Sequence, residues 1–144
     1  MKKASATYVL DTSALLTMIE DEAGADVVQT LLEQARTEDI AILLSFMSFM
    51  EVYYITLQER GLEEALARID LMTALPVLRV ESTESLSTLA AEIKAMHRLS
   101  VADAWIAALA KERGAVLVHK DPEFEQVEKM IGVLCLPYKA AFAG

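Results

Sequence analysis

Short apolar segments alternate with longer helical segments along this chain, and this alternation restricts its fold more than any other feature. The apolar segments cover residues 7–10, 40–44, 76–80, 115–118 and 133–136. Strands that are separated by helices pair in parallel, because each helical connection crosses back over the sheet. We therefore predict an α/β fold in which helices cover both faces of a parallel sheet.

The segments between these strands have the periodicity of amphipathic helices. Helices are expected from Thr12 or Ser13 to about residue 20, over residues 25–36, 47–59, 62–73, 84–98 and 101–113, and as a short turn after Pro122. In the helix over 62–73, Leu62, Leu66 and Ile69 recur in helical register. No repeat and no linker rich in Pro, Gly or Ser interrupts the pattern, so we predict a single domain over residues 1–144.

The charge of the chain argues against one class of function. Its 144 residues include 13 Lys and Arg but 22 Asp and Glu, which gives a net charge of −9. Proteins that bind nucleic acid regardless of sequence rely on Lys and Arg contacts to phosphates. The composition therefore excludes a general polyanion-binding protein. Binding to RNA would need a small basic rim, for which Lys120, Arg98 and Lys94 are the candidates.

Cysteine content and hydropathy exclude further classes. The single cysteine, Cys135, excludes an internal disulfide and a cysteine-rich zinc site. Because it lies in an apolar segment, we predict a buried and unreactive thiol. The longest unbroken apolar run covers residues 104–110, whereas a membrane-spanning helix needs about 20 residues. We expect a cytoplasmic protein with no membrane partner.

Acidic residues stand where a parallel sheet usually binds its ligand, beyond the carboxyl ends of the strands. Asp11 directly follows the first apolar segment, Asp121 follows the fourth, and Asp103 falls in the first turn of the helix over 101–113. Each also suits a helix N-terminus, either as a capping residue or as a first-turn acid after Ser100. Taken singly, each is explained at least as well by capping as by chemistry.

Glu51 is different, because it lies inside the helix over 47–59, where capping cannot explain it. Its neighbours are mostly apolar, and a buried carboxylate without a partner is costly, although a solvent-exposed face is also open to it. If Asp11, Glu51, Asp103 and Asp121 converge, their charges need a counter-charge. Mg²⁺ and Mn²⁺ prefer oxygen ligands, whereas zinc prefers Cys and His. We therefore predict a Mg²⁺ or Mn²⁺ site, with Asp11 as its central ligand because Asp11 follows the sheet directly.

The order of these motifs resembles that of the PIN-domain family, in particular its VapC-type ribonuclease toxins. The motifs that carry the resemblance are, in chain order, Asp11-Thr12-Ser13, Ser45 with Glu51 six residues later, Ser100 with Asp103-Ala104, and Asp121-Pro122-Glu123-Phe124. They span nearly the whole chain, and the stretch from Asp103 to Phe124 is the most specific. One residue departs from the pattern: many relatives carry Thr two positions before the last acid, where this chain has His119.

The resemblance implies a fold, an activity and a set of partners. The fold is a three-layer α/β/α sandwich around a central, mainly parallel five-stranded sheet. The activity is Mg²⁺- or Mn²⁺-dependent cleavage of RNA phosphodiesters. The catalytic acids and their supporting hydroxyl correspond to Asp11, Glu51, Asp103, Asp121, and Thr12 or Ser13. The partners are an RNA substrate, a cognate antitoxin and a second copy of the chain in a homodimer.

Two further groups of residues are candidates for contacts with partners. Lys120 and His119 follow the fourth strand and are candidates for RNA contact, although packing at the strand end explains His119 equally well. Met and aromatic residues are dense over 46–54. Most belong in the core, and the surplus suits either a homodimer face or a groove for a partner helix.

Other functions stay open at this point. A PIN-fold nuclease that processes RNA without a toxin role has the same motifs, and a PIN-like protein that only binds another protein would lack the metal. A haloacid-dehalogenase-like phosphohydrolase needs Asp-x-Asp after its first strand, where this chain has Asp11-Thr12-Ser13. A receiver-like signalling module needs adjacent acids there, and a phosphoacceptor aspartate on a later strand where this chain offers Glu51.

Overall fold

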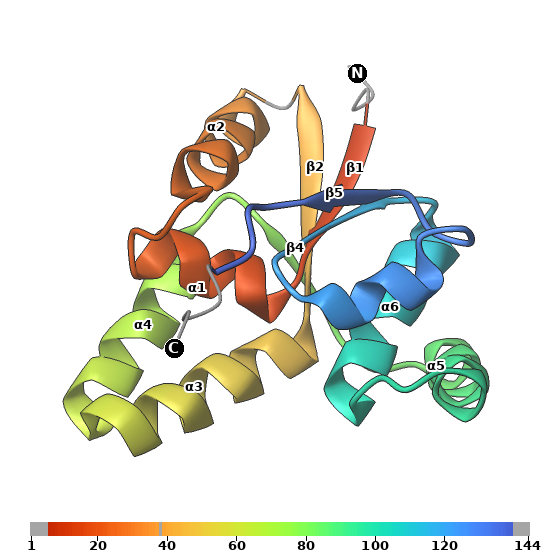
Figure 1. Cartoon of the computed structure of the whole chain (residues 1–144). Coiled ribbons are helices and arrows are strands. Elements are labelled where there is room, and N and C mark those ends of the chain that lie inside the picture. The colour runs from red at the N-terminus through yellow and green to blue at the C-terminus, as the bar shows by residue number, and fades with distance from the viewer. Residues whose placement is uncertain (1–5, 38, 140–144) are drawn as a thin grey trace, which may run out of the picture.

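Parallel strands form a central five-stranded sheet in the order β3-β2-β1-β4-β5. The computed structural model, which describes residues 6–37 and 39–139, is shown in Figure 1. The strands are β1 (Ala6–Leu10), β2 (Ile40–Ser45), β3 (Leu78–Val80), β4 (Val116–His119) and β5 (Val133–Cys135). Helices pack on both faces of this sheet, so the predicted three-layer α/β/α architecture is confirmed.

Within the described residues, the strands are connected by α-helices and by one short 3₁₀ helix. The helices are α1 (Thr12–Ile19), α2 (Ala25–Arg36), α3 (Phe46–Arg60), α4 (Leu62–Ala74), α5 (Glu84–Met96), α6 (Val101–Arg113) and the 3₁₀ helix η1 (Pro122–Val127). The side chains of Asp11, Ser45, Thr83 and Ser100 each accept a hydrogen bond from the first turn of the helix that follows. These caps satisfy N–H groups that have no partner inside the helix.

Neighbouring residues of the central strands enter two separate hydrophobic cores. Val9 of β1 and Leu117 of β4 belong to the core that α5 and α6 cover. Leu10 and Val118, one position further along, belong to the core under α1, α2, α3 and α4. The alternation follows from the pleat of the strand. Figure 1 shows α5 and α6 on the opposite side of the sheet from α2 and α4.

The leucines in helical register on α4 do not mark its buried face. Leu62 and Leu66 are 55% and 50% exposed, whereas the buried residues of this helix are Ala65, Arg68 and Met72. Both stripes have helical spacing, so the pattern alone does not choose between them.

The buried Arg68 side chain explains which stripe turns inward. Its Nη1 atom donates hydrogen bonds to Thr56 Oγ1 (3.3 Å) and Glu20 Oε2 (3.4 Å), and its Nε atom donates to Glu64 Oε1 (3.4 Å). A buried guanidinium is tolerated because these partners replace water. The polar contacts of Arg68 thereby join α4 to α1 and α3.

The prediction of a buried Cys135 is also wrong. This residue is exposed, because β5 is the edge strand of the sheet and pairs only with β4. A strand at the edge is covered less completely than a central one.

The sheet reverses its direction of growth between β1 and β4. The chain adds β2 and β3 on one side of β1, and then β4 and β5 on the other. The carboxyl ends of β1 and β4 therefore lie together, and the Asp11 N–H donates a hydrogen bond of 2.9 Å to the Val118 carbonyl. Such a reversal is where open parallel sheets bind ligands. None of the helices in the described part of the chain is long and apolar enough to cross a membrane.

Candidate metal centre

Asp11 leaves β1 as the N-cap of α1, and its two carboxylate oxygens have different surroundings. Oδ2 accepts hydrogen bonds from the Ser13 N–H (3.0 Å) and from the Ser13 hydroxyl. Oδ1 is buried and has no hydrogen-bond partner among the residues that the structure describes. The side chain is 2% exposed. Capping thus accounts for one oxygen and leaves the other for a further ligand.

Asp121 follows β4 and caps η1. Its Oδ1 atom accepts a hydrogen bond of 2.9 Å from the Glu123 N–H, and its own N–H donates one of 3.1 Å to His119 Nδ1. His119 is 1% exposed, and its ring lies against Phe124 with centroids 5.1 Å apart. A ring so buried offers no surface to RNA. The structure therefore favours packing over RNA contact for His119, which holds the backbone of Asp121.

Asp103 lies in the first turn of α6, with 8% of the residue exposed. Its N–H donates a hydrogen bond of 3.1 Å to Ser100 Oγ, as the capping interpretation predicts. Its carboxylate also lies near two other acids. One oxygen from each of Asp103, Asp121 and Glu123 can be chosen so that the three atoms lie within 4.8 Å of one another. Atoms at such separations can bind one cation together.

Glu123 was not among the predicted ligands. It stands two positions after Asp121, on the 3₁₀ turn that Pro122 begins. The Asp-Pro-Glu motif contained the signal, because the Asp121 side chain caps the turn by accepting a hydrogen bond from the Glu123 N–H and so keeps the two residues close together.

Glu51 reaches the site from α3 and is held by α1. The Thr12 hydroxyl donates a hydrogen bond of 2.6 Å to Glu51 Oε1. Ser48 Oγ lies 3.0 Å from the same hydroxyl oxygen. Thr12 and Ser48 are buried, and Glu51 is half-buried. The supporting hydroxyls expected near the first acid therefore have separate partners: Ser13 bonds to Asp11, and Thr12 to Glu51.

Burial and mutual repulsion raise the pKa values of three acids of this site. Burial is the largest cause for Asp11, whose pKa is raised to about 7 against the opposing hydrogen bonds from Ser13, with help from the charges of Glu51 and Asp121. The pKa of Asp103 is raised to about 8, first by burial and then by the charges of Asp11, Asp121 and Glu51. Burial raises the pKa of Glu51 as well, and the Asp121 charge adds to it. The structure thus brings all the predicted acids within electrostatic reach of one another.

This donor set fits a hard divalent cation. Every candidate ligand is a carboxylate oxygen, the preferred donor of Mg²⁺ and Mn²⁺ and a poor set for zinc. The partnerless, buried Oδ1 atom of Asp11 is the clearest sign, because such an atom is costly unless a ligand satisfies it. A bound cation would also remove the repulsion that raises these pKa values.

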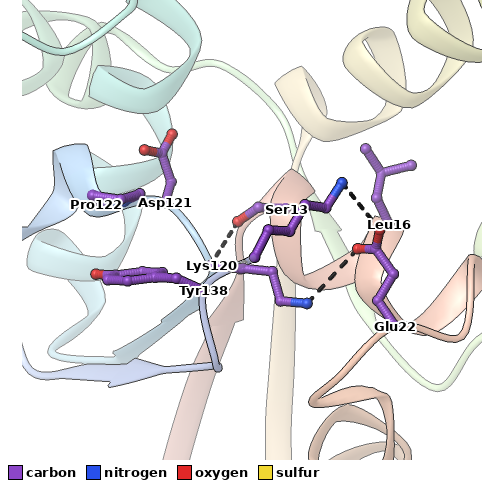
Figure 2. Close-up of a pocket in the computed structure, with 8 residues that line it drawn as sticks. Ser13, Leu16, Glu22, Lys120, Asp121, Pro122 and Tyr138 are labelled. Atoms are coloured by element: carbon purple, nitrogen blue, oxygen red, sulfur yellow. Dashed lines mark hydrogen bonds and ion pairs between the residues drawn. The ribbon is translucent and has the colours of Figure 1, made fainter. Parts of the chain in front are cut away.

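Of the three residues predicted for a basic rim, Lys120 alone lines a pocket beside Asp121. Lys139, which the sequence analysis did not single out, lines the same pocket (Figure 2). Arg98 does not line this pocket; its N–H donates to Gln126 Oε1 (2.8 Å), and Gln126 Nε2 in turn donates to the Arg98 and Glu123 carbonyls. Lys94 lines a separate pocket on α5 and α6.

The fold and the motifs also match a known family. A family model described as "PIN domain" matches residues 8–130, a range that contains every acid of the candidate site. The chain belongs to the PIN domain family. The resemblance read from the motifs is thereby confirmed.

Solved structures share this PIN-domain fold at low sequence identity. VapBC2 from Rickettsia felis, bound to a promoter DNA fragment, aligns with a TM-score of 0.73 and 15% identity over 91% of this chain and 99% of that chain. DNA-bound VapBC from Salmonella typhimurium aligns with a TM-score of 0.72 and 19% identity, over 90% and 98%. VapC20 from Mycobacterium tuberculosis, described as a sarcin-ricin loop cleaving toxin, aligns with a TM-score of 0.65 and 17% identity, over 83% and 94%. No curated protein sequence matches the chain significantly.

Proposed function

We propose that this PIN-domain protein is a divalent-metal-dependent endoribonuclease with Asp11, Glu51, Asp103 and Asp121 as its catalytic carboxylates. The observation that carries the proposal is the convergence of these acids at the carboxyl ends of β1 and β4, where the pKa values of Asp11 and Asp103 rise to about 7 and about 8. Near neutral pH, such a cluster needs protons or cations to compensate its charge. VapC20, which is similar in fold, is described as cleaving the sarcin-ricin loop, and this supports RNA as the substrate.

Mg²⁺ or Mn²⁺ is the cofactor that we propose for this site. Asp11 would contribute its partnerless Oδ1 atom, and Asp103, Asp121 and Glu123 would contribute the oxygens that lie within 4.8 Å of one another. When bound, such ions lower the pKa of a coordinated water and neutralise charge on the phosphate under attack.

Neighbouring side chains keep the carboxylates in position. The two hydrogen bonds from Ser13 hold Oδ2 of Asp11, so Oδ1 is the oxygen left for a ligand. The Thr12 hydroxyl holds Glu51, which would bind a metal or orient a water molecule. His119 holds the backbone N–H of Asp121. Preorganised groups of this kind accelerate a reaction because they do not have to reorient as charge develops.

The enzymatic proposal is tested by RNA cleavage with Mn²⁺, with Mg²⁺ and with EDTA, on the wild-type protein and on Asp11→Asn, with the cut sites mapped. We expect cleavage with either metal, none with EDTA, and none by the variant. A purified and folded Asp11→Asn protein with full activity would contradict the assignment. Absence of Mn²⁺ and Mg²⁺ binding by the wild-type protein would favour a PIN-fold protein that only binds another protein.

We further propose that the protein is the toxin of a VapBC-type pair and acts in the cytoplasm. The VapBC complexes of Rickettsia felis and Salmonella typhimurium share its fold, which supports an antitoxin partner. Growth arrest on expression, relieved by a cognate antitoxin, is the expected result. Normal growth combined with RNA cleavage in vitro would favour the alternative of an RNA-processing nuclease. The phosphohydrolase and receiver-like alternatives are not retained, because the PIN-domain match covers residues 8–130.

Exposed apolar side chains on α3 and α4 support a partner surface. Met50, Leu62 and Leu66 are at least half exposed, and Tyr54 and Leu57 are each 41% exposed. Clusters of this kind usually mark interaction sites. We propose that a second copy of the chain covers them in a homodimer. Sedimentation of the protein alone tests this: Leu66→Asp should convert a dimer to a monomer, and a wild-type monomer would assign the surface to the antitoxin instead.

A further inference from the structure

A pocket of about 370 Å³ opens beside the acidic site, and the carboxylate chemistry proposed above does not use it. Ser13 and Asp121 line this pocket and also belong to the site, so the two are continuous. Its other lining residues include Glu22, from the connection between α1 and α2, and Tyr138 and Lys139, from the segment after β5. Figure 2 shows Asp121 and Tyr138 near one end of the pocket and Glu22 near the other.

A close backbone contact places the segment after β5 at this wall. Gly24 has a φ of +102°, and a Cβ atom there would lie 3.1 Å from Pro137 Cδ and 3.2 Å from Leu136 Cβ. Glycine adopts this conformation without strain and adds no atom to the contact. Pro137 can therefore pack against the start of α2, and the two residues that follow it reach the pocket.

Two lysines meet one glutamate inside the pocket. Lys120 Nζ lies 3.7 Å from Glu22 Oε1, and Lys139 Nζ lies 3.1 Å from Glu22 Oε2. The Lys120 ammonium group points at this carboxylate in Figure 2, and its side chain is only 6% exposed. The single negative charge of Glu22 neutralises only one of these two positive charges. Asp121 also lines the pocket, so the two lysines face two carboxylates. A cation held by Asp121 would leave only Glu22 to oppose the two ammonium groups.

Tyr138 adds an aromatic face to these cations. The residue is 40% exposed, and its hydroxyl donates a hydrogen bond of 3.3 Å to Glu125 Oε2, which orients the ring. Nucleobases stack on exposed tyrosine rings with little dependence on base identity. Lysine ammonium groups bind phosphates as point charges. One pocket thus combines a phosphate-binding pair with a base-stacking ring.

We propose that this pocket binds the nucleotide next to the scissile phosphate, with its phosphate at Lys120 and Lys139 and its base on Tyr138. The inference rests on the proposed ribonuclease function, because continuity with the acidic site makes the bound nucleotide part of the RNA substrate. Glu22 then competes with RNA: its carboxylate occupies both ammonium groups until a phosphate replaces it. Loss of the Glu22 charge should therefore strengthen RNA binding.

The first test measures steady-state cleavage of a short single-stranded RNA by full-length variants. Tyr138→Ala should raise KM roughly tenfold, as expected for loss of one stacked base, and Lys139→Gln should raise it about threefold. Tyr138→Phe keeps the ring and should raise KM much less than Tyr138→Ala. Glu22→Gln should lower KM about threefold. In all of them kcat should change little, because binding shared by the substrate and the transition state affects KM alone.

Two matched controls separate this pocket from general charge effects. Lys111→Gln removes an exposed cation in the last turn of α6, and Glu92→Gln removes an exposed carboxylate on α5. Neither residue lines the pocket. Both variants should keep the wild-type KM. Equal changes in Lys111→Gln and Lys139→Gln would overturn the inference, since net charge would then explain them.

A second test needs no cleavage. In EDTA, 5′-AMP should bind the wild-type protein in an NMR titration, more weakly after Lys139→Gln or Tyr138→Ala, and more tightly after Glu22→Gln. If the wild type cleaves RNA but these variants change neither KM nor 5′-AMP binding, the subsite is overturned and the ribonuclease function stands. If the wild type cleaves no RNA, the proposed function fails, and the titration still decides whether the pocket binds a nucleotide.

Discussion

The Thr12 hydroxyl on α1 donates a hydrogen bond of 2.6 Å to Glu51 Oε1 on α3, although 39 positions separate the two residues. This contact ties the mid-chain acid to the residue that follows Asp11. It therefore couples the packing of α3 against α1 to the geometry of the candidate metal centre.

Loss of that hydroxyl should impair catalysis more than stability. Thr12→Val keeps the shape of the side chain but removes the donor, so we expect RNA cleavage to fall about tenfold to a hundredfold, the range for residues that orient ligands. Thr12→Ser keeps a hydroxyl and should restore most of the activity. Cleavage rates with thermal unfolding of both variants measure the effect. Equal rates for Thr12→Val and the wild type would show that Glu51 does not depend on this contact.

Asp11→Asn should weaken metal binding and leave the fold intact. The amide oxygen of Asn can still accept the hydrogen bonds from Ser13, so the cap of α1 is retained, but the site loses a negative oxygen. We expect cleavage to fall more than about a hundredfold, beyond the range for orienting residues. Calorimetric titration with Mn²⁺ should show weaker binding. Circular dichroism identical to that of the wild type serves as the folding control.

The metal-free protein should lose stability as the pH rises. The pKa values of Asp11 and Asp103 rise from the ordinary value of 3.8 to about 7 and about 8 in the folded protein. Between these limits the folded state holds more protons than the unfolded state, so the free energy of unfolding falls with increasing pH. The contribution is complete below about pH 4 and lost above about pH 8. In EDTA, the Tm should be lower at pH 8.5 than at pH 5.5, and Asp103→Asn should reduce this difference.

Mn²⁺ should reverse this trend, because protons and metal compete for the same oxygens. The increase in Tm at a fixed Mn²⁺ concentration should be larger at pH 8 than at pH 6. A Tm that rises with pH in EDTA, or a metal effect independent of pH, would contradict the carboxylate cluster.

Glu123 should contribute to metal affinity, although the motifs did not predict it as a ligand. One of its oxygens lies within 4.8 Å of ligand atoms of Asp103 and Asp121. Glu123→Gln should weaken Mn²⁺ binding about tenfold. Glu128→Gln removes an exposed carboxylate that follows η1 and serves as the control. If both variants bind Mn²⁺ equally, Glu123 acts only through its charge.

Arg68 should matter for stability far more than its neighbour Arg60, although both pair with Glu20. The Arg68 side chain is 6% exposed and that of Arg60 is 52% exposed. Arg68→Ala should lower the free energy of unfolding by about 2–4 kcal/mol, because it leaves a cavity and removes buried polar contacts. Arg60→Ala should cost less than about 1 kcal/mol, as for exposed ion pairs. Urea denaturation distinguishes the two, and similar losses would contradict the buried role of Arg68.

Much of the fold was visible in the sequence, because strand and helix periodicities are local. The helix over residues 101–113 was predicted with the bounds of α6, and the positions of Asp11 and Asp121 after their strands followed from the apolar segments alone. The meeting of these two acids also followed from a general rule, since carboxyl ends of parallel strands share one edge.

The buried face of α4 shows what a local hydrophobic pattern cannot predict. The stripe of Leu62, Leu66 and Ile69 and the stripe of Ala65, Arg68 and Met72 have equivalent helical spacing, and hydrophobicity favoured the first. The structure buries the second, because Arg68 finds partners on α1 and α3. The hydrogen-bond partners of Arg68 come from distant parts of the chain, so a local hydrophobic pattern cannot indicate them.

The sequence by itself determined the strand–helix alternation, the acids and the family. Only the tertiary structure decided how the site is assembled. It joined Glu51 to Thr12, grouped Glu123 with Asp103 and Asp121, and set Lys139 beside Lys120. Periodicity indicates whether one segment is a helix or a strand, whereas these contacts depend on how separate elements pack against each other.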